Sequence, residues 1–297
     1  MTDVMHHPQR GEPQPRPEYI HEGPLNQEFG VVEKPLSIWE KLYNNGAVRK
    51  TILLLVIAAI WEVYARQLNN PLLVPTFTET LRTFFDAIAS GVIPAKALNS
   101  VRLLLQGYVL GLALALGLTV LAMTSRVGTD LLETLTSMFN PLPSIALLPL
   151  ALVWFGLGDK SIIFVLIHAV LWAVALNTHS GFRAVSNTLR MVGRNYGLSG
   201  MRFVFKILIP AAFPSILTGL KIGWAFAWRT LIAAELVFGA SSGQGGLGWF
   251  IYESKNMLDI PSVFAGLFAV ILIGLLVENL IFHNIEKVTV RRWGMQN

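Results

Sequence analysis

Three charged side chains interrupt an otherwise apolar stretch of the chain. Lys221, Arg229 and Glu235 lie within LKIGWAFAWRTLIAAEL. A charge at the middle of a bilayer costs at least about 2.5 kcal/mol, so each needs a partner or water. On one helix Arg229 and Glu235 would lie roughly 120° apart, and Lys221 roughly 21 Å from Glu235, so neither pair can meet within the helix. We therefore expect each charge to face another helix, another subunit or a water path, although Lys221 can also extend to the lipid headgroups.

These side chains suit electrostatic guidance of a solute rather than bond making. Arg229 can lend positive potential to a path for a small anion, or it can pair with Glu62 or Glu235 of a neighbouring helix and never meet substrate. His168 fits either a hydrogen-bonded core histidine or a transport role. The candidate substrate-pathway residues are Arg229, Glu235, Trp228, His168 and Trp154. The sequence shows no nucleophile and base pair, no metal-spaced cluster and no phosphate loop, so we expect no catalytic, cofactor-binding or metal site.

The composition is that of an integral membrane protein. Apolar residues make up 53% and charged residues 14% of the 297 positions, whereas soluble domains carry about 25% charged residues. The absence of cysteine excludes disulfides and thiol chemistry. The net charge of +5 bears on the orientation of the chain in the membrane and is no signal for nucleic acid.

The apolar pattern predicts an all-α membrane protein with six spans of about 20 residues each. They run from Thr51 to Leu68, Ser100 to Thr124, Leu131 to Gly158, Ile162 to Asn177, Ala211 to Phe238 and Val263 to Phe282. The third carries Pro141, Pro143 and Pro149, each of which removes a backbone donor and kinks the helix. The freed carbonyl groups then need other partners or a water-filled cavity, and such a span suits a place beside a transport path.

Shorter elements connect the spans. The proline-rich residues 1–35 read as a disordered tail, and residues 36–48 as an interfacial amphipathic helix. Thr76 and Glu79 form a capping box that begins a helix on or near the membrane, ending before Gly91. Residues 239–248, GASSGQGGLG, predict a turn, and a connecting stretch leads from there to the last span.

One basic segment, Val185 to Pro214, separates the fourth and fifth spans. Ser186 or Asn187 can cap a short helix, and Gly197 supplies the left-handed residue that ends it. A second short helix is expected from about Ser199. The basic side chains of this helix–turn–helix are Arg190, Arg194, Arg202 and Lys206. The apolar residues between them can lie against a membrane or in the groove of a partner.

The distribution of Lys and Arg predicts the topology. Six spans put both termini on one side, and that side holds 15 of the 23 basic residues, including those of the basic segment. The positive-inside rule then makes this side cytoplasmic.

Three sequence features together resemble the permeases of ABC importers. Gly197, twelve intervening residues and Pro210 resemble the second half of their cytoplasmic loop signature, whereas Met191, Val192 and Gly193 stand where those permeases have Glu-Ala-Ala. PLPSIALLPLALVWFGLG, from Pro141, and IPAAFPSILTGLKIG, from Ile209, resemble the nitrate, sulfonate, taurine and bicarbonate branch. The resemblance covers the chain from about Leu53 to Trp293.

This resemblance implies a type I ABC importer (MetI-like) transmembrane domain over residues 49–293, with a cytoplasmic coupling loop at 183–210. It implies a multi-pass protein of the bacterial inner membrane that is not an enzyme and has no cofactor, since a pair of ATPase subunits binds the ATP. A periplasmic binding protein, a second copy of the chain and membrane lipid are the other implied partners. The implied ATPase-coupling residues are Asn187, Leu189, Arg190, Met191, Arg194, Tyr196, Gly197 and Pro210.

The branch implies a small anion as substrate: an aliphatic sulfonate or taurine, nitrate or bicarbonate. An aromatic acid or a pyrimidine precursor is the alternative within the same family. A secondary transporter driven by an ion gradient through Glu235, Glu62 and His168 is a rival from another class, although no internal repeat is visible to support it. A membrane anchor for an enzyme would explain the basic loop but not the intramembrane charges.

Overall fold

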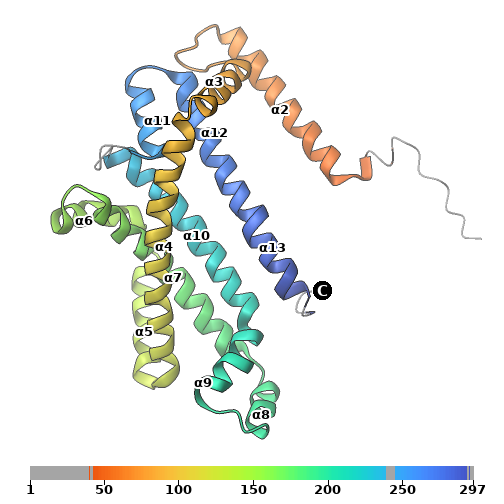
Figure 1. Cartoon of the computed structure of the whole chain (residues 1–297), viewed down its shortest axis with the longest axis vertical. Coiled ribbons are helices and arrows are strands. Elements are labelled where there is room, and N and C mark those ends of the chain that lie inside the picture. Colours follow the sequence, from red (N-terminus) through yellow and green to blue (C-terminus); the bar gives the residue numbers. More distant parts are fainter. Residues whose placement is uncertain (1–39, 41–42, 239–244, 293, 295–297) are drawn as a thin grey trace, which may run out of the picture. The chain divides into compact units, whose positions relative to one another are not determined.

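The computed structural model describes Glu40, residues 43–238, residues 245–292 and Gly294. The described residues form helices, turns and irregular segments but no strand, which confirms the all-α prediction (Figure 1). They fall into two units, one ending at Leu54 and one running from Leu55 to Asn297. The predicted disordered tail and most of the predicted interfacial helix lie outside the described residues.

The first long helix, α2, spans Gly46–Leu68 and contains the first predicted span. It begins five residues before Thr51 because the Asn45 side chain accepts a hydrogen bond from the Ala47 amide (3.0 Å) and so caps the helix. Farther along it, Arg66 pairs with Glu62 at 2.7 Å, one turn apart as the sequence spacing allows. Glu62 also accepts a hydrogen bond from the amide of Thr78 (3.0 Å), which joins α2 to the next helix.

Helix α3, Phe77–Ala89, begins as the sequence predicts. The Thr76 hydroxyl accepts a hydrogen bond from the Glu79 amide (3.1 Å), and Gly91 ends the segment with a φ of 79°. An aromatic cluster holds α2 and α3 against α12, Ile260–Leu276. Its stacked and edge-on rings are Trp61, Phe77, Phe84, Phe264 and Phe268.

Four helical runs among the described residues are long and apolar enough to cross a membrane. They are α4 (Val92–Thr124), α7 (Asp159–Ala184), the run Val204–Val237 through η2 (Val204–Leu208) and α10 (Ile209–Phe238), and the run Ile260–Arg291. The last run continues α12 through η3 (Val277–Phe282), α13 (His283–Glu286) and η4 (Lys287–Arg291). These runs cover four of the six predicted spans, apart from Phe238 at the end of one of them, and each run begins before the span that it covers.

The predicted proline-broken span is bent far more sharply than a kinked helix. Helix α5, Arg126–Phe139, is followed by the 3₁₀ turn η1, Ser144–Leu147, and helix α6, Leu148–Phe155, with a bend of 89° between them. Pro141 and Pro143 occupy the break, where neither can donate to a helix ladder. Counted as one span, this pair raises the candidate spans to five, and α2 contains the sixth predicted one.

The stretch that connects α10 to the last span is a helix, which the sequence analysis did not anticipate. Helix α11, Leu247–Asn256, follows Gly246 as its N-cap. The predicted turn at 239–248 is described only from Gly245 onward. Gly245 to Gly248 are buried there, so this part of the turn packs inside the protein.

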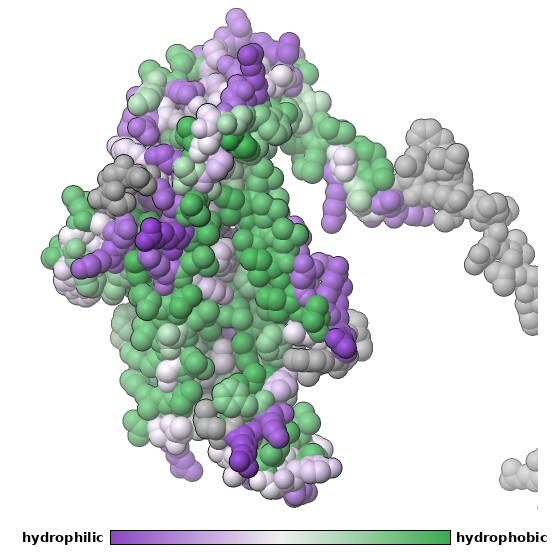
Figure 2. Space-filling view, in the orientation of Figure 1, coloured by the Kyte–Doolittle hydropathy of each residue, from purple (hydrophilic) through white to green (hydrophobic). Residues whose placement is uncertain are grey.

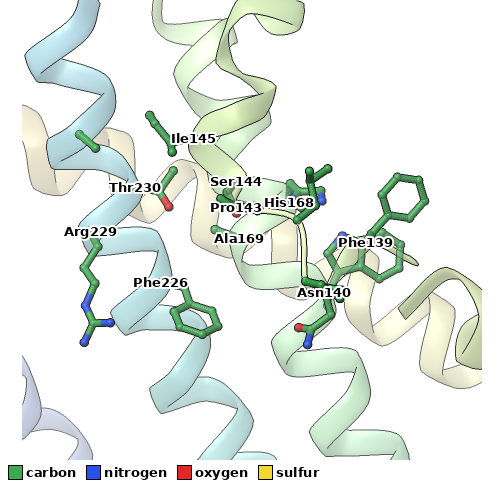
Figure 3. Close-up of a pocket in the computed structure, with 14 residues that line it drawn as sticks. Phe139, Asn140, Pro143, Ser144, Ile145, His168, Ala169, Phe226, Arg229 and Thr230 are labelled. Carbon is green, nitrogen blue, oxygen red and sulfur yellow. Dashed lines mark hydrogen bonds between the residues drawn. The ribbon is translucent and has the colours of Figure 1, made fainter. Parts of the chain in front are cut away.

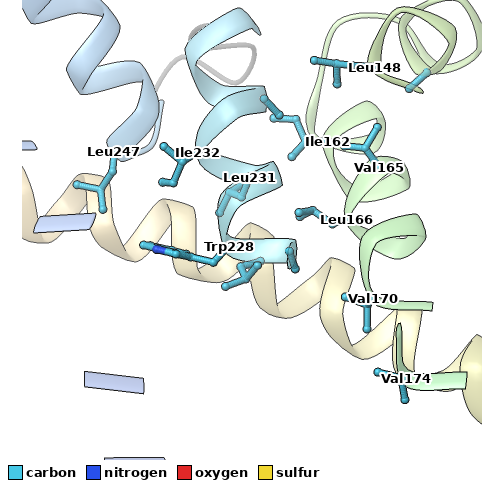
Figure 4. Packing of buried hydrophobic residues seen from close by; sticks show 14 of the residues in the cluster. Leu148, Ile162, Val165, Leu166, Val170, Val174, Trp228, Leu231, Ile232 and Leu247 are labelled. Atoms are coloured by element: carbon cyan, nitrogen blue, oxygen red, sulfur yellow. The ribbon is translucent and has the colours of Figure 1, made fainter. Parts of the chain in front are cut away.

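The core lies where α4, α7 and α10 cross, and Figure 4 shows part of it. Two glycines allow α4 to approach α7 closely, because a Cβ atom on Gly107 would lie 2.4 Å from Leu166 Cβ and one on Gly111 would lie 2.7 Å from Val170 Cβ. Gly117, the third glycine of α4, has open space around it instead.

Polar residues concentrate at the two ends of the long helices. In Figure 2 hydrophilic residues gather over α3 and α11 at one end and around α8 (Asn187–Asn195) and α9 (Gly200–Phe203) at the other. Most residues between them are apolar, apart from one hydrophilic group at mid-height and one beside the C-terminal segment. We call these two ends the α11 end and the loop end. The exposed apolar surface between them is far larger than a water-soluble monomer carries, as expected for a protein in lipid.

Candidate functional site

Helix α8 forms the first half of the predicted helix–turn–helix, and local hydrogen bonds set both of its ends. The Ser186 hydroxyl accepts from the Leu189 amide at the start (3.3 Å). At the end, the Gly197 amide donates to Arg194 O (2.8 Å) and the Leu198 amide to Gly193 O (3.0 Å), the two bonds of a Schellman motif. Gly197 adopts the left-handed φ of 71° that this motif requires.

Arg190 points back toward the bundle. Its guanidinium group donates to Phe182 O (2.6 Å) and Val185 O (3.2 Å), two carbonyl groups at the C-terminal end of α7. Phe182 O also accepts from the Val185 amide (3.4 Å), and a cation is favourable at this C-terminal end of a helix. The structure therefore places this predicted coupling residue at the joint between α7 and α8, where it fixes the angle of the short helix.

Four apolar side chains of α8 and its C-cap remain exposed. Leu189 is 44% exposed, Met191 57%, Val192 41% and Tyr196 82%. Asn187 and Arg194 are also exposed, so most of the predicted coupling residues lie on one accessible surface. A polar helix end carrying this much uncovered apolar side chain is typical of a surface that a partner covers.

The opposite face of α8 packs closely on the segment that follows it. A Cβ atom on Gly193 would lie 2.7 Å from the ring of Phe203 and 3.0 Å from Ile207. Below this contact, Phe182, Val185, Leu208 and Ala212 form a separate small core. Pro210 is the second residue of α10, directly after the π-helical segment η2, so its missing amide proton coincides with an irregular part of the helical run. The loop, the end of α7 and the start of α10 thus form one packed block.

A pocket lies beside the break between α5 and α6, which is one of the two arrangements that the prolines allow. Its volume is about 350 Å³, and its walls come from the break, from the middle of α7 and from α10 (Figure 3). One wall is aromatic: Phe139 stacks on Trp172 with ring centroids 5.3 Å apart, and His168 meets both rings edge-on.

The polar groups of this pocket come from each of its three walls. Ser144 Oγ and His168 Nδ1 are 3.2 Å apart, and which atom donates depends on the tautomer of the histidine. The break adds Asn140, and α10 adds Arg229 and Thr230. Figure 3 shows Thr230 directed from α10 toward Ser144, whereas the Arg229 guanidinium group lies on the other side of that helix, away from Ser144 and His168. The sequence analysis missed Asn140, Ser144 and Thr230, although all three flank residues that it did identify.

Arg229 is exposed and forms no ion pair with the residues that the structure describes. Neither of its two predicted acidic partners is used, since Glu62 pairs with Arg66 and Glu235 accepts hydrogen bonds elsewhere. The described lining of the pocket contains no Asp or Glu. The pocket therefore carries an uncompensated positive charge.

The other predicted pathway residues do not line this pocket. Trp228 is 7% exposed in the main core, and Trp154 is 58% exposed on α6, where it packs against Phe155 and Phe164. Glu235 is 1% exposed near the α11 end. Of the five candidates, only Arg229 and His168 are among the described lining of this pocket, on different walls of it.

Lys221 faces another helix, one of the partners expected for it. Its ammonium group lies 2.7 Å from Glu286 on α13 and 3.8 Å from Glu278 on η3. The charge is thus compensated within the chain. Among the described residues no group of three or more His, Asp or Glu side chains is arranged to hold a metal ion.

Comparison with known proteins identifies the family. A family model described as the binding-protein-dependent transport system inner membrane component matches residues 107–290, from α4 into η4. The chain belongs to this family. Members are named as transport permease subunits and are not enzymes. This permease is therefore a multi-pass inner-membrane component of an ABC importer, a class that works with an ATPase and a substrate-binding protein.

Several curated relatives align with most of the permease. A putative ABC transporter permease of Methanocaldococcus jannaschii is 31% identical over 242 residues, 80% of this chain and 90% of the relative. The nitrate import permease of Synechocystis is 28% identical over 256 residues, covering 84% and 90%. The taurine transport permease of Escherichia coli is 29% identical over 237 residues, covering 76% and 82%.

Proposed function

We propose that this permease imports a small anion, of the nitrate, taurine or aliphatic sulfonate type. The observation that carries this substrate class is Arg229, an exposed cation without an ion pair in the described chain, at a pocket whose described lining has no acidic group. An anion passing this point gains electrostatic stabilisation that a cation does not. The names of the nitrate and taurine relatives support the same class.

The α8 surface is the proposed docking site for the separate ATPase subunits. Its exposed apolar residues, Leu189, Met191, Val192 and Tyr196, would insert into a groove of that partner. The packing of Gly193 on Phe203 and the Arg190 cap on α7 support a rigid lever, because they tie α8 to both long helices.

Movement of this lever would reach the pocket through α10. That helix begins in the loop block at Ile209, and its residues 226–233 line the pocket. A rigid-body shift at the loop end would therefore displace one wall of the pocket relative to the α5–α6 break. This is the kind of domain movement by which a transporter alternates between inward and outward openings.

The proposed orientation puts the loop end in the cytoplasm, where ATP is available, together with both termini. The α11 end would then receive substrate from a binding protein in the periplasm. The basic residues of the loop end support this orientation by the positive-inside rule. A second copy of the chain would complete the pore, and lipid would cover the exposed apolar surface of the bundle.

One observation favours an aromatic acid as a second candidate substrate. Phe139, Trp172 and Phe226 give the pocket flat apolar walls, which suit an aromatic carboxylate better than nitrate. The import of nitrate, taurine and benzoate by the same preparation, each with its concentration dependence, separates the candidates.

The test is uptake by proteoliposomes that contain the permease, its ATPase and its binding protein. Arg229→Gln should lower anion uptake at least about tenfold while the subunits still assemble, and Arg229→Lys should retain a measurable part of it. Arg82→Gln, which removes an exposed arginine of α3, is the matched control and should leave uptake unchanged. Full uptake by Arg229→Gln would exclude the anion pathway, and uptake without ATP would exclude the importer mechanism in favour of an ion-driven transporter.

A further inference from the structure

Glu235 is a buried carboxylate that does not line the pocket, so the proposed substrate path gives it no role. It lies in the last turns of α10 and is 1% exposed, and no other Asp or Glu among the described residues is buried. An ionised group in such a place persists only with several hydrogen-bond donors around it. Its partners therefore indicate what it does.

The donors belong to two other helices. The Ser100 hydroxyl of α4 lies 2.8 Å and 2.9 Å from the two carboxylate oxygens, and the Gly248 amide of α11 donates to Oε2 at 2.8 Å. The Ser100 oxygen in turn accepts from the Leu247 amide (2.8 Å). One carboxylate and one hydroxyl thus satisfy the first two amides of α11.

These bonds replace a missing cap. The N-cap of α11 is Gly246, which has no side chain to accept from the first amides of the helix. A Cβ atom on Gly246 would lie 2.0 Å from Glu235 Oε1, and one on Gly248 would lie 2.6 Å from Glu235 Cβ. The two glycines are therefore what lets the carboxylate approach the backbone of α11.

Neighbouring contacts strengthen the same joint. The Asn99 side chain of α4 donates to Gly245 O (3.5 Å), just before α11. Leu247 is fully buried and faces Ile232 of α10 in Figure 4. The start of α11 is thus held by α4 on one side and by α10 on the other.

We propose that Glu235 is a positioning residue that caps α11 from α10 and so makes α11 follow the movement of that helix. Since α10 starts in the loop block and ends at this clamp, one helix links the loop end to the α11 end. This second step rests on the proposed function, because it takes the ATPase as the source of the movement. The capping itself does not depend on that function.

The first experiment measures amide hydrogen exchange over residues 245–256 in the purified full chain. Glu235→Ala and Ser100→Ala should raise exchange at the start of α11 about tenfold or more, because the first removes the acceptor of the Gly248 amide and the second that of the Leu247 amide. Glu235→Gln should give a smaller rise, since its amide oxygen can still accept from Gly248. It also serves where the alanine variant does not fold.

Ser161→Ala is the matched control. Ser161 is also fully buried, and its hydroxyl donates to Ala151 O and Gly156 O at the turn between α6 and α7. It should raise exchange there but not in α11. Unchanged exchange of α11 in both Glu235 variants, or an equal rise in the Ser161 control, would overturn the capping role.

The second experiment repeats the exchange with the assembled importer, with and without ATP. In the unsubstituted protein ATP should change exchange in α11, and in Glu235→Gln that change should fall at least about threefold while ATP hydrolysis continues. An undiminished ATP response would refute the transmission through Glu235. A chain that binds no ATPase would refute the proposed function instead and would leave the capping result standing.

Discussion

The two ends of α10 differ in whether groups that need a partner find one within the chain. At the α11 end, a buried carboxylate and the uncapped amides of α11 satisfy one another inside the chain. At the loop end, α8 satisfies its own backbone, yet four apolar side chains stay uncovered. The difference teaches which end is complete. The α11 end has its partners within the sequence, whereas the loop end presents a surface that another protein would cover.

The largest expected effect on stability is at the α11 end. Gly246→Ala places a methyl group where Glu235 Oε1 is 2.0 Å away, so the clamp must open. We expect the variant to be destabilised by about 1–3 kcal/mol, the usual cost of overpacking. Thermal unfolding in detergent measures this. Gly117→Ala, where the added methyl group meets open space, is the control and should not lose stability. Equal unfolding temperatures of the two variants would contradict the clamp.

A smaller loss is expected at Gly197 in the loop. Alanine in the left-handed conformation costs about 1–2 kcal/mol, and the residue ends an exposed helix that can fray. Gly197→Ala should therefore speed amide exchange across α8 while the unfolding temperature changes less than in Gly246→Ala. Gly197→Asn should be milder because asparagine tolerates this conformation. Slow exchange of α8 in the alanine variant would show that its end is held by other contacts.

The smallest effect on stability is expected for Tyr196→Ser. This variant also tests most directly whether another protein covers the loop end. The ring is 82% exposed, so its loss should change the free energy of unfolding by less than about 0.5 kcal/mol. Binding of the ATPase subunits should nevertheless weaken about tenfold or more if the ring inserts into their groove. Pull-down and titration with the purified ATPase measure this. Met257→Ser, 70% exposed at the C-terminal end of α11, should alter neither quantity.

Features fixed by neighbours in sequence could be predicted well. Ser186 and Gly197 delimit α8 through hydrogen bonds that span at most five residues. Thr76 caps α3 in the same way. Pro141 and Pro143 break the third span because they lack an amide proton wherever they stand. A cavity beside them was one of two arrangements expected for that reason, whereas the bend of 89° was not expected.

Features that depend on distant residues could not be predicted. Helix α11 escaped notice because its caps come from Ser100 and Glu235 and not from its own first residues. Glu235 was grouped with Arg229 as a pathway residue, yet it lies outside the pocket. Arg190 was assigned to a partner surface, but its guanidinium group donates hydrogen bonds to carbonyl groups at the end of α7.

The sequence by itself determined the class of the protein, the position of most of its helices, the proline break and both ends of α8. Apolar composition, proline and left-handed glycine act through the residue itself or its near neighbours, so no fold is needed to read them. The tertiary structure alone decided which intramembrane charges are compensated. Lys221 meets Glu286 and Ser100 meets Glu235 across 65 and 135 residues, while Arg229 meets no described acid. Those pairings follow from how the helices cross, and the spacing of residues along one chain does not specify that crossing.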